Sequence, residues 1–218
     1  PSRNTGADIQ PARFAMNILL LHDEVGSGSS ADELDVLNQM DAIEVVLTEL
    51  GHAHQRLACS LNLGSVEAAI RQSGVDLVFN LVESLGGQGR LIQTAPALLD
   101  TMGVPYTGCP SDAVWLTSNK LVAKKLLTAA GVATPEWFTL DQLERGTTVP
   151  GGRYIIKSVW EHASRGLDDA SVVETSRPET LAAALRERLP LLGGEGFAER
   201  YIDGREFNLS LLAIEQPR

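Results

Sequence analysis

The sequence is poor in cysteine: only Cys59 and Cys109 occur in 218 residues, far apart and outside any CxxC motif. Such usage is typical of a reducing cytoplasm and argues against a structural disulfide. Catalysis by a thiol would require a thiolate of lowered pKa, and that alternative stays open from sequence alone. Two ordinary thiols in a cytoplasmic protein are the favoured interpretation.

Long apolar runs and excess positive charge are also missing. No stretch of about 18 apolar residues occurs, which argues against a membrane-spanning helix. Residues 1–15 are polar and lack the apolar core of a signal peptide, so we expect a disordered extension or a cloning remnant. The formal net charge of −10 argues against a nucleic-acid surface. It does not exclude a nucleotide, for which a few local cations and backbone N–H groups suffice.

Between residues 16 and 112, strand-like apolar runs alternate with helical patterns. The clearest strand is Asp76–Val82, which is rich in Val, Leu and Phe. Strands are expected at 17–22, 53–57, 76–82 and 104–106, and helices at 31–50, 65–73 and 91–102. This alternation predicts a parallel α/β sheet with helices on both faces, which binds ligands beyond the carboxyl ends of its strands. Glycine-rich loops at 26–30 and 86–89 follow two of these strands.

Beyond residue 112 the pattern changes, and we predict a second domain of α+β type at residues 113–218. A long helix is expected from Ser111 to Ala130. Strands are expected at 136–140, 153–159, 171–174, 196–202 and 205–213, with a helix at 177–188. Asp203-Gly204 is a hairpin signal that should join the last two strands.

Several residues of the second domain could bind a nucleotide. Lys157 ends an apolar strand and precedes a small-residue loop that contains Ser164, an arrangement able to hold a phosphate. Lys120 could reach a phosphate from the expected helix. Glu199 and Glu206 could accept hydrogen bonds from adenine and ribose. Taken alone, each feature is better explained by an ordinary surface residue, so only their combination points to a site.

In this order and spacing the segments resemble the ATP-grasp superfamily, and most closely its D-alanine–D-alanine ligases. The resemblance spans about residues 17–213 and rests on 79–93 (FNLVESLGGQGRLIQ), 98–108 (LLDTMGVPYTG), 118–135 (SNKLVAKKLLTAAGVATP), 155–166 and 199–206 (ERYIDGRE). It implies two subdomains that clamp ATP, with Lys120 and Lys157 as ATP lysines and Ser164 in the loop that covers the phosphates. It also implies that the segment from Glu199 to Glu206 holds adenine and ribose.

The substrate end departs from the pattern of these ligases. Asp32, in Ser30-Ala31-Asp32, could fill the role of the family's acidic residue and hold a substrate amine. The family's His-Gly pair is replaced by Val82-Glu83, and Glu83 is either a substitute amine-binding carboxylate or part of a loop salt bridge. The first substrate pocket is therefore altered, and D-alanine specificity is in question. The resemblance puts the acidic Mg²⁺ ligands beyond Arg218, so we assign no metal ligand and expect the chain alone to be inactive.

The resemblance implies an ATP-dependent carboxylate–amine ligase that works through an acyl phosphate. Amino-acid-like small molecules are the expected substrates, and a homodimer through the N-terminal domain is expected. One alternative is a non-catalytic ATP-binding module. Another is an NAD-dependent oxidoreductase, because residues 26–31 fit GxGxxA, although Gln55-Arg56-Leu57 lacks the acidic residue that such an enzyme needs.

Overall fold

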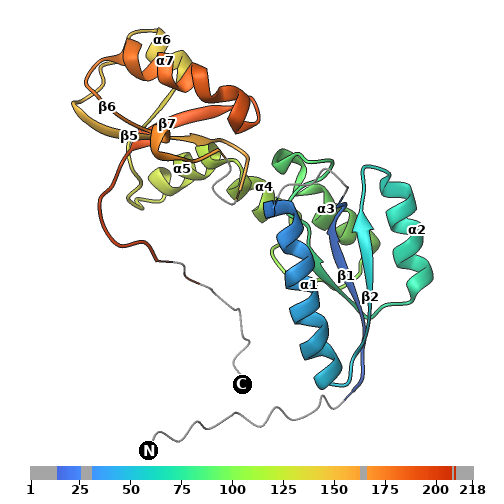
Figure 1. Cartoon of the computed structure of the whole chain (residues 1–218). Coiled ribbons are helices and arrows are strands. Elements are labelled where there is room, and N and C mark those ends of the chain that lie inside the picture. The colour runs from blue at the N-terminus through green and yellow to red at the C-terminus, as the bar shows by residue number, and fades with distance from the viewer. Residues whose placement is uncertain (1–13, 26–30, 163–165, 208, 210–218) are drawn as a thin grey trace, which may run out of the picture.

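The computed structural model describes residues 14–25, 31–162, 166–207 and 209, except for the side chains of residues 31–34. It contains a three-stranded parallel sheet followed along the chain by a four-stranded antiparallel sheet (Figure 1). The predicted α/β class, with a parallel sheet first and an α+β unit second, is therefore confirmed. Of the extension predicted at residues 1–15, only residues 14 and 15 are described. Among the described helices, none is long and apolar enough to cross a membrane.

The parallel sheet has the strand order β2-β1-β3, so β1 is its central strand. Its half of the chain contains β1 (Asn17–Asp23), α1 (Ala31–Glu49), β2 (Ala53–Cys59), α2 (Leu63–Ser73), β3 (Leu77–Leu81), the 3-10 turn η1 (Gly89–Leu91) and α3 (Thr94–Met102). Side chains of β1 alternate between the two faces of the sheet, as pleating requires. Leu19 and Leu21 pack with α2 and α3, whereas Ile18 and Leu20 pack with α1. Helices thus cover both faces of the parallel sheet.

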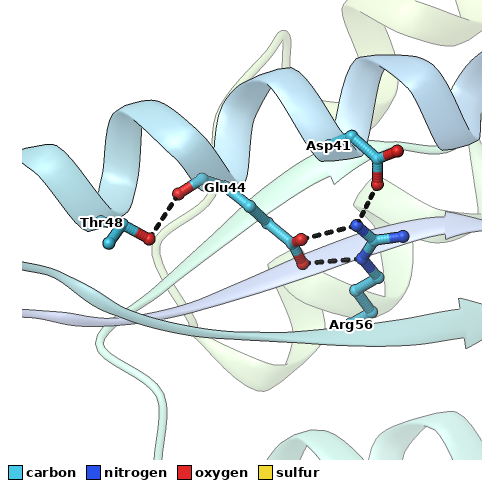
Figure 2. Close-up of polar contacts among 4 residues, drawn as sticks. All are labelled: Asp41, Glu44, Thr48 and Arg56. Atoms are coloured by element: carbon cyan, nitrogen blue, oxygen red, sulfur yellow. Dashed lines mark hydrogen bonds and ion pairs between the residues drawn. The ribbon is translucent and has the colours of Figure 1, made fainter.

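A group of ion pairs connects α1 to β2 (Figure 2). Arg56 donates from Nε to Glu44 Oε1 at 2.6 Å and from Nη2 to Asp41 Oδ1 at 2.5 Å. Donation from Arg56 lowers the pKa of Glu44. Half-exposed pairs of this kind contribute at most about 1 kcal/mol each. Burial of Met40 and Leu47 therefore does more to hold α1 on the sheet.

The antiparallel sheet has the strand order β4-β7-β5-β6. Its elements are β4 (Trp137–Thr139), α6 (Leu140–Glu144), β5 (Gly152–Ser158), η2 (Asp169–Ser171), β6 (Val172–Thr175), α7 (Pro178–Arg188), η3 (Leu189–Leu192) and β7 (Gly196–Arg200). Tyr154, Ile156 and Ala198 join the apolar core beneath α6 and α7. The alternate residues of β5 and β7 face the opposite side, where α5 (Lys120–Ala129) lies (Figure 1).

The helix predicted at residues 111–130 is wrong in one respect, because it is two helices. α4 (Ser111–Ser118) ends at Asn119, whose ψ of 101° is not helical, and α5 begins at Lys120. The Asn119 side chain accepts hydrogen bonds from the N–H groups of Leu121 and Val122, both at 3.0 Å. An asparagine that caps a helix in this way starts a new one rather than continuing the old. The domain boundary predicted near residue 112 stays a prediction.

The hairpin predicted at Asp203-Gly204 is also wrong for the residues described. β7 ends at Arg200, and residues 201–207 contain no strand. The sheet order gives the physical reason: β7 already pairs with β4 on one side and β5 on the other. No edge of β7 is left for a returning strand. Likewise the strand predicted at 104–106 is a single bridge between Val78 and Tyr106.

Candidate functional site

Two predicted site residues meet on the face of the antiparallel sheet that α5 covers. Lys157 lies near the end of β5, and Glu199 lies on the adjacent strand β7. Lys157 Nζ is 2.6 Å from Glu199 Oε1. The Lys157 side chain is 34 % exposed and that of Glu199 only 11 %. The lysine is therefore within reach of a ligand, whereas the carboxylate lies mostly beneath it.

A second lysine, which the sequence analysis missed, binds the other oxygen of the same carboxylate. Lys124 of α5 donates to Glu199 Oε2 at 2.7 Å and to Thr134 Oγ1 at 2.8 Å. Its ammonium group also lies 5.1 Å from the centre of the Trp137 ring. Lys124 follows Lys120 by four residues, a spacing that puts both on one face of a helix. That spacing is the signal that could have identified it.

Lys120, the first residue of α5, contacts the loop that follows β5. Its Nζ donates to the Glu161 carbonyl at 2.7 Å, and its backbone N–H donates to the Val159 carbonyl at 3.1 Å. Burial lowers the pKa of Lys120, and the charge of Lys157 lowers it further. The structure thus gathers Lys120, Lys124, Lys157 and Glu199, which we call the lysine cluster.

Positive charge exceeds negative charge in the lysine cluster. Burial raises the pKa of Glu199, but hydrogen bonds from Lys124 and Lys157 outweigh it, so the net shift is downward and Glu199 is ionised. The Glu161 carboxylate also attracts Lys120. Among the described residues, three ammonium groups therefore face two carboxylates. An anionic ligand beside Lys120 and Lys157 would balance this charge.

Of the remaining predicted nucleotide-binding residues, Glu206 does not join the cluster. It is exposed in the strandless segment after β7, and within the described chain no hydrogen bond or ion pair links it to the cluster. Ser164 lies outside the described residues, as does the side chain of Asp32. The glycine–serine loop at 26–30 is outside them too. Their roles stay predictions.

Glu83 lies at the carboxyl edge of the parallel sheet, beside a carboxylate that the sequence analysis did not single out. Asp23, the last residue of β1, accepts hydrogen bonds on Oδ1 from the N–H of Glu83 at 3.0 Å and on Oδ2 from Ser84 Oγ at 2.8 Å. Burial raises the pKa of Asp23 despite these bonds. Burial, followed by repulsion from Asp23 and Asp35, raises the pKa of Glu83. The two carboxyls therefore form an electronegative edge that would favour a cation.

Loops from the two sheets touch between this edge and the lysine cluster. The Gly89 N–H donates to Glu161 Oε1 at 3.4 Å. Arg90 lies 5.8 Å from the centre of the Trp160 ring, and Trp160 is held within its own half by donation from Nε1 to Glu195 Oε2 at 2.9 Å. The segment after β5 thus contacts both the parallel half and Lys120. Within the described residues, no group of three or more His, Cys, Asp or Glu side chains could hold a metal ion.

Several D-alanine–D-alanine ligases are similar to the chain. A D-alanine–D-alanine ligase from Synechococcus sp. (strain JA-3-3Ab) is 28% identical over 204 residues, covering 91% of this chain and 59% of the relative. One from Methylococcus capsulatus is 36% identical over 161 residues, covering 69% of this chain and 49% of the relative. The chain thus spans about half to three fifths of such relatives. No protein-family model matches it.

Solved structures agree with the curated relatives. The D-alanine–D-alanine ligase from Bacillus anthracis complexed with ATP has a TM-score of 0.60 and 18% identity. The match covers 87% of this chain and 61% of that one. At this identity the similarity establishes the fold.

Proposed function

We propose, from the premise that this chain is a D-alanine–D-alanine ligase-like protein of the ATP-grasp superfamily, that it binds ATP for a carboxylate–amine ligase reaction. The observation that carries the proposal is the excess of positive charge in the lysine cluster. Lys120 and Lys157 lie on different elements and neither is fully buried. They would bind phosphate oxygens, while Glu199 would accept a hydrogen bond from the adenine amino group.

In the proposed complex Lys157 changes its partner. Its ammonium group is paired with Glu199 Oε1. In the complex it would turn toward a phosphate and release that oxygen. The segment after β5, with Ser164, would cover the phosphates and exclude water, since an acyl phosphate hydrolyses readily. Glu206 would bind the ribose.

Phosphoryl transfer to a substrate carboxylate, followed by attack of an amine, is the reaction that we propose. Glu83 and Asp32 would attract the ammonium group of an amino-acid-like substrate, and the raised pKa of Glu83 reflects burial beside Asp23. Mg²⁺ would be expected to neutralise the phosphates. The described residues offer no fitting group of metal ligands, so we derive no step through Mg²⁺. A cytoplasmic location and dimerisation through the N-terminal half remain part of the proposal.

Substitution of Lys157 by methionine tests the proposed nucleotide site. A charge-assisted hydrogen bond contributes about 1.5–3 kcal/mol, so ATP affinity should fall roughly 10- to 100-fold. Competition with a fluorescent ATP analogue measures this affinity. Lys125→Met is the matched control, because Lys125 lies exposed on α5, next to Lys124. Equal ATP affinity in Lys157→Met and the wild type would remove Lys157 from the site.

Turnover separates the proposed ligase from its alternatives. Phosphate release from ATP on addition of amino acids, measured on the protein expressed from its whole reading frame, supports a ligase. ATP binding without phosphate release across a panel of amino acids supports a non-catalytic module. Binding of NADH but not ATP supports an oxidoreductase and contradicts the proposal.

A further inference from the structure

Lys124 differs from the other two lysines of the cluster because its ammonium group is already fully engaged. The residue is 6% exposed. Its Nζ contacts Glu199 Oε2, Thr134 Oγ1 and the face of Trp137. A ligand could reach it only by displacing these partners. Lys124 is therefore not a phosphate ligand, and the mechanism proposed above leaves it without a role.

The two oxygens of Glu199 are held in different ways. Oε2 is bound to buried Lys124, whereas Oε1 is bound to Lys157, whose side chain is 34 % exposed. When Lys157 turns to a phosphate, Oε1 loses its partner and Oε2 keeps its own. A buried carboxylate without a cation would bind a proton instead of staying charged. Lys124 keeps its hydrogen bond to Glu199 Oε2 and so prevents this protonation at the moment of ligand binding.

We propose that Lys124 is a positioning residue, which keeps Glu199 ionised and oriented so that Oε1 is a free hydrogen-bond acceptor once Lys157 binds phosphate. This inference rests on the proposed function. A charged acceptor attracts the amino group at position 6 of adenine and repels the carbonyl oxygen at position 6 of guanine. Lys124 would thus support selection of ATP over GTP without touching either nucleotide.

The test compares ATP and GTP binding in three variants, using the fluorescent analogue as competitor. Lys124→Met should lower ATP affinity at least tenfold and bring the ratio of ATP to GTP affinity close to one. Lys124→Arg keeps the charge and should retain most of that ratio. Lys125→Met should behave as the wild type.

The pH dependence of ATP affinity separates a positioning role of Lys124 from a merely structural one. Loss of a structural role alone would not shift this dependence. The charged groups that face Glu199 are Lys124 and Lys120 of α5 and Lys157 of β5. Without Lys124, Glu199 becomes protonated at higher pH, so the loss of ATP affinity on acidification should begin at higher pH. An unchanged profile and an unchanged ATP-to-GTP ratio in Lys124→Met, even with a lower melting temperature, would overturn the inference.

A double variant covers the case in which Lys124→Met does not fold. Lys124→Met/Glu199→Gln removes both buried charges together, which cores commonly tolerate. It should bind ATP and GTP equally through Lys120 and Lys157, whereas wild-type discrimination in this variant would contradict our inference. If the wild type itself binds neither nucleotide, the proposed function fails and this inference fails with it. Wild-type ATP binding with unaltered discrimination in the variants refutes the inference alone.

Discussion

Glu199 is the residue on which both the stability and the chemistry of the lysine cluster depend. It is 8% exposed and pairs with two lysines. Removing one partner of a buried pair costs about 3–5 kcal/mol, because the remaining charge is left uncompensated. Glu199→Gln should therefore lower the free energy of unfolding by about 3 kcal/mol at neutral pH. Urea denaturation measures the change, and Glu206→Gln, at an exposed carboxylate, is the control.

The same residue makes stability depend on acid. The pKa of Glu199 is lower in the folded state than in the unfolded chain. In an unfolded chain glutamate titrates at about pH 4.3, as in a model peptide. Its contribution is thus complete above that pH and is lost as pH falls through the lower, folded-state value. Part of the acid dependence should disappear in Glu199→Gln. Parallel acid unfolding curves for the wild type and the variant would contradict this assignment.

Single residues differ in how well the sequence identified them. The order of their segments along the chain identifies Lys120, Lys157 and Glu199, and the structure brings these residues together. Lys124 was missed because a helical lysine is normally solvent-exposed. The four-residue spacing from Lys120 places Lys124 on the same helix face. Its burial, however, results from a β7 carboxylate distant in the sequence, which that spacing does not encode.

Helix α5 carries two of the three cluster lysines, so its first turn determines where they point. Asn119 caps it through hydrogen bonds to the N–H groups of Leu121 and Val122. Asn119→Ala should lower the free energy of unfolding by about 1 kcal/mol. It should also weaken ATP binding, because Lys120 and Lys124 would no longer be held in position. Chemical denaturation and nucleotide competition measure the two effects. Asn119→Asp, which keeps a capping oxygen, should restore both, and failure of that rescue would count against the cap.

Helices and strands whose formation depends mainly on their own residues were predicted well from local sequence patterns. The β1 and β3 runs and the helices α1, α2 and α7 occur close to their predicted positions. The misses share a cause in the neighbouring structure. Asp203-Gly204 is an adequate turn, but β7 has no free edge for a returning strand. Asn119 interrupts a continuous apolar pattern because its side chain competes for backbone N–H groups.

The contact between the two halves of the molecule depends on a glycine. A Cβ at Gly89 would come within 2.9 Å of the Trp160 carbonyl oxygen, so Gly89→Ala should displace the segment after β5. Amide hydrogen exchange at Val159–Glu161 should then accelerate several-fold. Gly64→Ala in α2 is the control, since its Cβ meets nothing closer than 3.8 Å. Unchanged exchange in Gly89→Ala would mean that the contact does not restrain this segment.

Such contacts between halves are what sequence patterns leave out. The class of each half followed from the alternation of strands and helices, and both sheets are present. The contacts of Arg90 with Trp160, and of Gly89 with Glu161, join segments whose local sequences contain no mark of one another.

The strand order of the antiparallel sheet has a consequence for biosynthesis. Of the four strands in this sheet β7 is translated last, yet it lies between β4 and β5. Proteins leave the ribosome at about 5–20 residues per second and generally fold domain by domain. The parallel half can therefore form early in the nascent chain, while β4, whose only partner in the described sheet is β7, must wait. Until Glu199 emerges from the exit tunnel, Lys124 lacks the carboxylate with which it pairs in the folded sheet. A chaperone that shields this half would have to remain bound until then.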